Sequence, residues 1–538
     1  MVTGMVKSIS LSKAAQIMIR ASRRSIKTSN AFVGSPTQWS YCAVALMLLG
    51  ATAANAQDTG SRRLISIIPR VSMTETLTDN VALATTNRQS EQITELTPGL
   101  RVTSDAGRVK GYFDYALNTR VYAQNTSGRS SQNALNTFGT FEAVDNFAFL
   151  DFSGAISQQA ISALGVQSSN AASINGNSTE STTLRMSPYL RGRLSSVAQY
   201  EARFSLTSNR TQSLLVSDVQ TRDYSLNLKN QNTGSRLGWS LNATQQAIVY
   251  SAARSTESEN LSGSVSYAID PQINVSITAG QESNNFTSAA KQSNWTSGWA
   301  LNWSPSDGTK VTLSRQNRSF GESHNISVDH RTGRTVWRLS DSQDITSTPS
   351  QTSIGSIGST YDLYFSQFAS LEPDPIKRAA LVTSFLQTNG ISASAPVISS
   401  FLTSAVSLQR RQDLSFSLLG LRDTVIFIAT RSATSRVDTI STTLDDLSNA
   451  TVVYQNGISV SYAHRLTPDT AMNVLTSIQQ SSDSKGLQDT STRSLNMSIS
   501  SKIGAKTTAA LSARRVVFDS KAAPYTESSI IGTLNVQF

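Results

Sequence analysis

The stretch from Val109 to Gln124, VKGYFDYALNTRVYAQ, decides the fold. Its odd-numbered positions are mainly apolar, among them Phe113 and Leu117, whereas its even-numbered positions include Asp114 and Asn118. Successive side chains of a β-strand point to opposite faces, so the pattern predicts a strand with one apolar and one polar surface. Its 16 residues exceed the ~5–6 residues of a usual globular strand. They suit a tilted membrane strand, which needs ~9–11 residues plus its extensions.

The same alternation recurs along the chain, for example from Ala198 to Thr207 and from Ile273 to Ala279. The two-residue period of apolar and polar side chains is, by itself, also compatible with a β-sandwich or a β-solenoid. However, the polar faces carry repeated charges, which a dry sandwich core could not bury unpaired and a wide, water-lined barrel accepts. We therefore predict an all-β fold: a large transmembrane antiparallel β-barrel of about 20–22 strands, from about Leu64 to Phe538. The residues predicted to lie on its polar lumen face are Lys110, Asp114, Asn118, Arg120, Glu201 and Arg203.

Two kinds of connection separate the alternating segments. Tight turn signals such as Asp270-Pro271 and Thr467-Pro468-Asp469 alternate with longer Ser/Asn/Gly-rich stretches such as Ser162 to Ser181. Short periplasmic turns and long extracellular loops are typical of outer-membrane barrels. The connections thus favour the same fold and predict a location in the cell outer membrane.

The first 56 residues have the pattern of a secretory signal peptide. They contain six basic residues and no acidic one, then the apolar run from Tyr41 to Gly50, and they end in Ala54-Asn55-Ala56. A positive segment, an apolar segment too short to span a bilayer and an Ala-x-Ala end predict cleavage after Ala56, although an uncleaved membrane anchor stays open. The only cysteine, Cys42, lies in this segment. Residues 57–538, the predicted barrel chain, would therefore have no disulfide and no cysteine metal site.

The charge and the chain order after this segment argue against two classes of function: nucleic-acid binding, and transport through a barrel that is filled by an N-terminal plug domain. Removing six of the 46 basic residues leaves 40 against 36 acidic residues, so the net charge falls from +10 to +4. We therefore expect no nucleic-acid partner, despite a sequence pI near 9.7. The first predicted strand begins within about ten residues of the cleavage site. This spacing leaves no room for an N-terminal plug domain of the kind that 22-stranded transporters hold in the lumen.

The C-terminal segment alternates up to a terminal aromatic residue. Ile530, Leu534, Val536 and Phe538 share one face, and the chain stops on Phe538. A last strand of this kind resembles the signal read by the outer-membrane assembly machinery. We therefore predict that machinery and outer-membrane lipid as partners.

One segment, predicted to span residues 344–396, breaks the alternation with two helices. Its aromatic residues follow helical spacing, Asp374-Pro375 suits the start of a second helix, and Asn389-Gly390 suits its end. The candidate residues of this insertion are Tyr361, Tyr364, Phe365, Phe368, Ile376 and Phe385. We predict an extracellular lid that packs on itself over the mouth, because a polar lumen wall would not bury apolar stripes. A lumen plug and a partner-binding lobe are the alternatives.

The sequence offers little catalytic chemistry. It has three histidines, His324, His330 and His464, none at metal-ligand spacing from another, and it lacks a Gly-x-Ser-x-Gly elbow, a phosphate loop and a zinc motif. We predict no catalytic residue, no cofactor and no metal. His324 and His330 share one face of a predicted strand, which keeps an outer-membrane hydrolase as a distant alternative.

Several motifs resemble a family of outer-membrane β-barrels associated with PEP-CTERM/exosortase systems. They are Ile67-Ile68-Pro69, the segment from Thr74 to Asn80, the segment from Glu95 to Leu100, the segment from His330 to Trp337, and Leu408 to Arg411. The resemblance implies a porin-like pore or a scaffold in exopolysaccharide export and envelope biogenesis, with exopolysaccharide and export proteins as partners. A non-transporting surface or adhesion barrel that presents polar loops is the main alternative.

Overall fold

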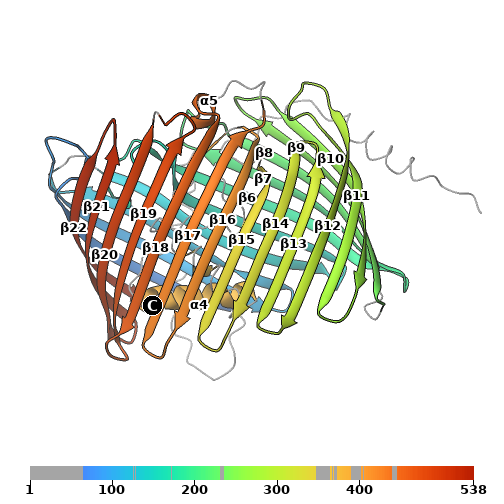
Figure 1. Cartoon of the computed structure of the whole chain (residues 1–538). Coiled ribbons are helices and arrows are strands. Elements are labelled where there is room, and N and C mark those ends of the chain that lie inside the picture. Colours follow the sequence, from blue (N-terminus) through green and yellow to red (C-terminus); the bar gives the residue numbers. More distant parts are fainter. Residues whose placement is uncertain are drawn as a thin grey trace, which may run out of the picture. The chain divides into compact units, whose positions relative to one another are not determined.

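The computed structural model describes residues 65–538, except 125–126, 128, 171, 231–234, 347–360, 362–363, 366–367, 369–371, 373, 389–400, 404, 439–444 and 487. In this part of the chain, 22 strands form one sheet. Each strand pairs antiparallel with the next, and β22 pairs with β1, so the sheet closes into a barrel (Figure 1). The predicted fold class is therefore confirmed. The predicted signal peptide, residues 1–56, lies outside the described residues.

The strands are long, as the alternation predicted. They are β1 (Ile65–Thr78), β2 (Glu91–Ala106), β3 (Val109–Tyr122), β4 (Arg129–Val144), β5 (Ala148–Ala160), β6 (Ser178–Leu194), β7 (Ala198–Thr211), β8 (Val219–Asn230), β9 (Leu237–Tyr250), β10 (Thr256–Ala268), β11 (Ile273–Asn284), β12 (Gln292–Ser306), β13 (Thr309–Arg318), β14 (Gly321–Arg331), β15 (Thr335–Thr346), β16 (Ser407–Leu419), β17 (Asp423–Arg436), β18 (Val452–Arg465), β19 (Thr470–Asp483), β20 (Asp489–Gly504), β21 (Thr507–Ser520) and β22 (Tyr525–Gln537).

The two faces of the sheet differ in polarity. In β3, Phe113 and Val121 are exposed on the outer face, whereas Arg120 is 3% exposed and forms its contacts on the other face. The outer face carries exposed apolar side chains around the barrel, including Trp239, Leu261, Ile277, Trp299, Ile499, Ile530 and Leu534. A closed barrel with an apolar outer wall and a polar lumen is the form of bacterial outer-membrane proteins. The protein is accordingly an outer-membrane barrel.

The connections define two different ends. At the short-turn end, even-numbered strands pass to the next strand through brief turns, such as residues 107–108 between β2 and β3. At the opposite end, which we call the long-connection end, odd-numbered strands pass to the next strand, in three places through long connections of residues 161–177, 347–406 and 437–451. The C-terminus lies at the short-turn end (Figure 1).

Two helices lie within the long connections: α4 (Pro375–Thr388) between β15 and β16, and α5 (Asp446–Asn449) between β17 and β18. As predicted, α4 begins after Asp374, whose Oδ1 accepts a hydrogen bond from the backbone N–H of Lys377 at 3.4 Å. The insertion starts later than predicted, because residues 344–346 still belong to β15. No helix of the described residues is long and apolar enough to cross a bilayer.

Candidate functional site: the obstructed lumen

The lumen wall carries charged side chains that are paired across neighbouring strands. Asp114 on β3 forms salt bridges with Arg70 at 2.5 Å and with Arg101 at 3.7 Å. Arg120, further along β3, is paired with Glu95 on β2. These pairs lie on the face of the sheet opposite to that of Phe113. Because side chains alternate between the two faces of a strand, this is the face inside the barrel. A wide, water-lined barrel accepts charged side chains of this kind.

The other residues predicted for the lumen face lie on the same wall: Lys110, Asn118, Glu201 and Arg203. Asn118 Oδ1 accepts a hydrogen bond from the Thr97 hydroxyl at 3.0 Å. Arg203 forms a salt bridge with Glu201 at 3.1 Å along the same face of β7. The wall is therefore a network of polar side chains over several strands.

The described residues between Tyr361 and Thr388, which we call the hairpin, lie inside the barrel. Tyr361, Tyr364 and Phe365 are helical, and α4 follows them. Its apolar side chains pack against the lumen face of β17 in one cluster of buried residues, namely Tyr364, Phe368, Val382, Leu386, Ile426 and Ile428. Tyr361, Phe365 and Phe385 pack against the edge of this cluster, and Ile376 lies in the first turn of α4.

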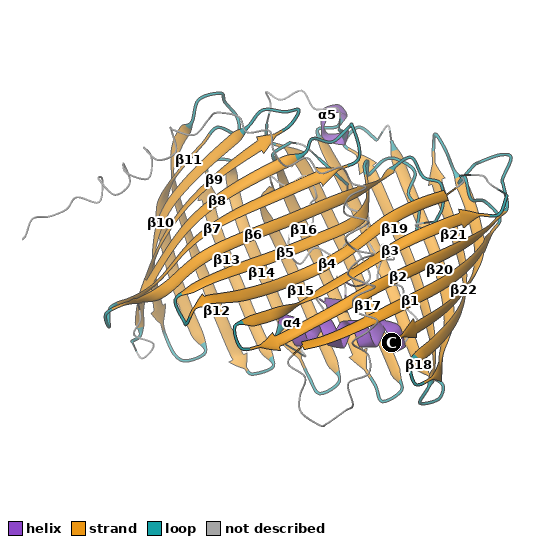
Figure 2. Cartoon of the chain, turned by 180° about the vertical axis from the view of Figure 1, so that it is seen from behind, coloured by secondary structure: helices purple, strands orange, loops and turns teal. Residues whose placement is uncertain are grey.

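The position of the hairpin differs from the predicted extracellular lid. Strand β15 ends at the long-connection end, yet α4 lies close to the short-turn end, at the level of the C-terminus (Figures 1 and 2). Ile426 is the fourth residue of β17, which starts at the short-turn end. The hairpin thus occupies the lumen deeply instead of covering the mouth from which its connection leaves.

The physical reason is an apolar patch on an otherwise polar wall. The expectation of self-packing assumed a polar lumen face on every strand. In β17, however, the run from Val425 to Ala429 is apolar at both odd and even positions. Ile426 and Ile428 are 2% and 1% exposed because the hairpin covers them. An unbroken apolar run within an alternating chain indicates a strand that is buried on both faces, and this was the missed signal.

Polar contacts join the hairpin to the wall on both sides of the β1–β22 junction. The Tyr364 hydroxyl lies 3.0 Å from the Ser461 hydroxyl on β18. The Tyr361 phenol forms a side-chain hydrogen bond with Tyr112 on β3. Helix α4 contacts both β3 and β20, which lie on either side of the β1–β22 junction. The hairpin therefore bridges the lumen on this side of the barrel.

A second obstruction lies at the long-connection end. The loop of residues 161–177 reaches β22 and the connection that follows β1, where the backbone N–H of Ile174 donates to the Val81 carbonyl at 2.9 Å. On its other side, Asp446 of α5 accepts hydrogen bonds from the Ser162 hydroxyl and the Ala163 N–H, both at 2.7 Å. Burial raises the pKa of Asp446. The loop thus connects α5 with the β1–β22 junction.

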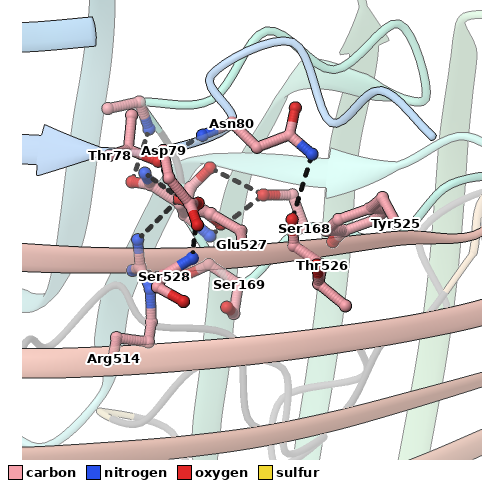
Figure 3. A network of polar contacts seen from close by, with 12 residues as sticks. Thr78, Asp79, Asn80, Ser168, Ser169, Arg514, Tyr525, Thr526, Glu527 and Ser528 are labelled. Carbon is pink, nitrogen blue, oxygen red and sulfur yellow. Dashed lines mark hydrogen bonds and ion pairs between the residues drawn. The ribbon is translucent and has the colours of Figure 1, made fainter. Parts of the chain in front are cut away.

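The contact of this loop with β22 centres on a buried carboxylate (Figure 3). Glu527 is 1% exposed, and its Oε1 accepts hydrogen bonds from the Thr78 hydroxyl at 3.0 Å and from Asn170 Nδ2 at 3.2 Å. Arg514 on β21 lies 3.4 Å from the same oxygen and also donates to the Ser169 carbonyl. One ionic pair therefore joins β21, β22, β1 and the loop. Nothing in the periodicity of the sequence indicated this contact.

The histidines lie away from the lumen obstructions. His324 Nε2 lies 3.2 Å from Asp341 Oδ1, and His330 pairs across the sheet with Trp337, whose side chain is exposed on the outer face. His324 and His330 thus share a face, as predicted, but it is the outer face of β14. Among the described residues, no group of three or more His, Cys, Asp or Glu side chains could hold a metal ion.

Comparisons with known proteins leave the function of the chain open. No family model and no curated protein matches the sequence. Solved structures that resemble the barrel include the FrpB iron transporter from Neisseria meningitidis, with 11% identity, 88% of this chain and 82% of that chain covered, and a TM-score of 0.49. The siderophore receptor PirA from Pseudomonas aeruginosa has 8% identity, with 89% and 81% covered and a TM-score of 0.43. Likenesses at this level carry no information about what this chain transports or binds.

Proposed function

We propose that the protein is a gated outer-membrane conduit associated with exopolysaccharide export, in which the hairpin is the gate. The observation that carries the proposal is the attachment of the hairpin. It is held on the wall by an apolar patch of two isoleucines, Ile426 and Ile428, and by isolated polar contacts such as that of Tyr364 with Ser461. A barrel of about 22 strands has a lumen too wide for its own side chains to fill. Moving the hairpin off the patch would therefore widen the water-filled lumen at the short-turn end, and ions would then pass beside the loop of residues 161–177.

The wall itself does not depend on the hairpin. Each strand forms its backbone hydrogen bonds with neighbouring strands, and β16, β17 and β18 pair in continuous register beneath the patch. Release of the hairpin would expose mainly the apolar cluster to water, while the ladder of the barrel stays intact. A gate needs this separation between a moving part and a fixed frame.

The link with exopolysaccharide is supported by the resemblance to barrels of PEP-CTERM/exosortase systems. The proposal includes no catalytic step. A non-transporting surface barrel is the second candidate, favoured by the loop contacts at the long-connection end. There, Asp446 and Glu527 hold residues 161–177 across the lumen.

Single-channel recording in planar bilayers tests the proposal. Replacing residues 361–388 by a short Gly/Ser linker should leave a folded, heat-modifiable barrel, because no strand is removed. This variant should conduct in large, stable steps, whereas the wild-type barrel should be mostly closed. A folded variant whose conductance equals that of the wild type would contradict the gate and favour the surface barrel.

A further inference from the structure

The part of the lumen opposite the hairpin has a chemistry of its own. The contacts of the hairpin described above lie on β3, β17, β18 and β20. In a closed ring of 22 strands, β6 to β12 lie across the lumen from β17, β18 and β20, and β6 is three strands away from β3. A polymer that passes the hairpin would run along this wall.

Strand β6 presents a row of arginines to the lumen. Arg185, Arg191 and Arg193 occupy alternate positions of its inner face, while Leu184, Met186 and Leu190 are exposed on the outer face. Arg191 and Arg193 are exposed within the lumen. Among the described residues, neither of these two arginines forms a salt bridge within 4.0 Å.

Stacked aromatic rings hold the middle of this row in place. The Arg191 guanidinium lies 4.1 Å from the ring centroid of Phe149 on β5. Phe149 stacks on Tyr189 at 5.0 Å with an interplanar angle of 14°. On the other side, Arg203 lies 3.9 Å from the Tyr189 ring centroid. Stacking of this kind orders a guanidinium without using its hydrogen-bond donors.

The acidic side chains beside the row are already engaged. Glu201 lies opposite Arg191 in the register of β6 and β7, but its carboxylate is paired with Arg203. Asp151 also pairs with Arg203, at 2.7 Å. Arg203 therefore takes up both carboxylates. The donors of Arg191 and Arg193 remain available to a ligand, and the local charge is positive.

The neighbouring wall is polar, and its charged residue Glu282 on β11 is buried and paired with Arg318. The inner faces of β9 to β12 carry hydroxyl and amide side chains at alternate positions, including Asn242, Thr244, Asn260, Ser262, Ser264, Ser276, Thr278, Thr296 and Asn302. Such side chains both donate and accept hydrogen bonds, as the hydroxyl groups of a sugar do. A row of cations beside a wall of hydroxyls and amides matches a ligand that has both acidic groups and many hydroxyls.

We infer that the lumen face of β5 to β7 is a binding subsite for an acidic saccharide, an inference that rests on the proposed function and names its substrate class. Arg191 and Arg193 bind the carboxylate or phosphate groups of the chain, because a guanidinium matches such groups with two parallel hydrogen bonds. The β9 to β12 wall contacts the sugar hydroxyls. The stack of Phe149 and Tyr189 positions Arg191 and does not itself contact the sugar.

Equilibrium binding to the purified, detergent-solubilised barrel tests the subsite without requiring an open pore. The probes are oligogalacturonate and an uncharged malto-oligosaccharide of the same length, measured by isothermal titration calorimetry. The wild type should bind the acidic probe and show at least about tenfold weaker binding of the neutral one. The double variant Arg191→Gln/Arg193→Gln should lose about tenfold or more in affinity for the acidic probe, because two charge-assisted contacts are removed.

The matched control is Lys310→Gln/Lys502→Gln, which removes the same charge from two exposed lumen lysines on β13 and β20. It should change the affinity by less than about threefold, in line with a general effect of charge. Equal losses in the two double variants, or equal binding of the two probes, would overturn the subsite. If the linker variant conducts but the barrel does not bind the acidic probe specifically, the subsite is refuted and the gate is not. If the barrel binds the acidic probe specifically but the linker variant does not conduct, the gate is refuted and the subsite is not.

Discussion

Replacing Ile426 and Ile428 by serine should release the hairpin and leave the barrel folded. Both side chains are almost fully buried by the hairpin, at 2% and 1% exposure. Burial of an isoleucine side chain contributes about 1.5–3 kcal/mol, so the two together contribute about 3–6 kcal/mol to docking. Since ~1.4 kcal/mol corresponds to a factor of ten, the double substitution should lower the ratio of docked to released hairpin by roughly 10²- to 10⁴-fold.

The strand itself should tolerate the change, because serine occupies lumen positions on the neighbouring strands, such as Ser415 and Ser459. Two assays report the release: single-channel conductance, which should rise, and protease cleavage within residues 361–388, which should become faster. Ser432→Ala, on the same face of β17, is the control and should change neither. A folded double variant with wild-type conductance and a protected hairpin would refute the reasoning that these two side chains hold the gate.

Three further predictions concern the wall, its assembly and the long-connection end. Phe113→Arg should reduce the yield of folded barrel much more than Asn118→Arg, because arginine at a lipid-facing midplane position costs about 2–4 kcal/mol; the opposite order in a heat-modifiability assay would invert the assigned faces. Deletion of Phe538 should lower the amount of folded protein in outer-membrane fractions, and an unchanged amount would remove its role in assembly. Because burial raises the pKa of Asp446, the protonated carboxyl favours the contact with residues 161–177, and this stabilisation is lost as the pH rises through the folded-state pKa. Protection of the backbone amides in the described part of residues 161–177, corrected for intrinsic exchange, should therefore fall as the pH rises above the usual range of an aspartate and become independent of pH in Asp446→Asn; a flat wild-type profile would contradict it.

The barrel could be predicted from the sequence because the pattern that specifies each strand lies within a short stretch of the chain. Every strand of an outer-membrane barrel repeats the same two-residue alternation, and each strand pairs with its neighbour in the chain. The segment from Val109 to Gln124 therefore already contains the pattern of the whole wall. The second helix of the insertion was equally visible, since Asp374 and Pro375 mark the start of α4.

The site could not be predicted to the same extent, because its contacts join segments far apart in the chain. Tyr364 meets Ser461, and Asn170 meets Glu527, at separations of 97 and 357 residues. Alternation shows only that Glu527 faces the lumen, not which loop reaches it. The docking of the hairpin had one visible sign, the apolar run from Val425 to Ala429. The stacking of Arg191 on Phe149 follows from the register of β5 and β6, which a single strand pattern does not fix.

The pairing of β1 with β22 has a consequence for how the wall withstands sideways stress. This junction has nine paired positions, from Arg70 to Thr78, whereas β1 and β2 share 14. It is also the junction that joins the first and last strands of the sheet, so no turn tethers its two strands. A cylinder with one seam that no turn tethers would split there first. The loop of residues 161–177, anchored through Asn170 to Glu527 and through Ile174 to Val81, acts as an internal brace across that seam.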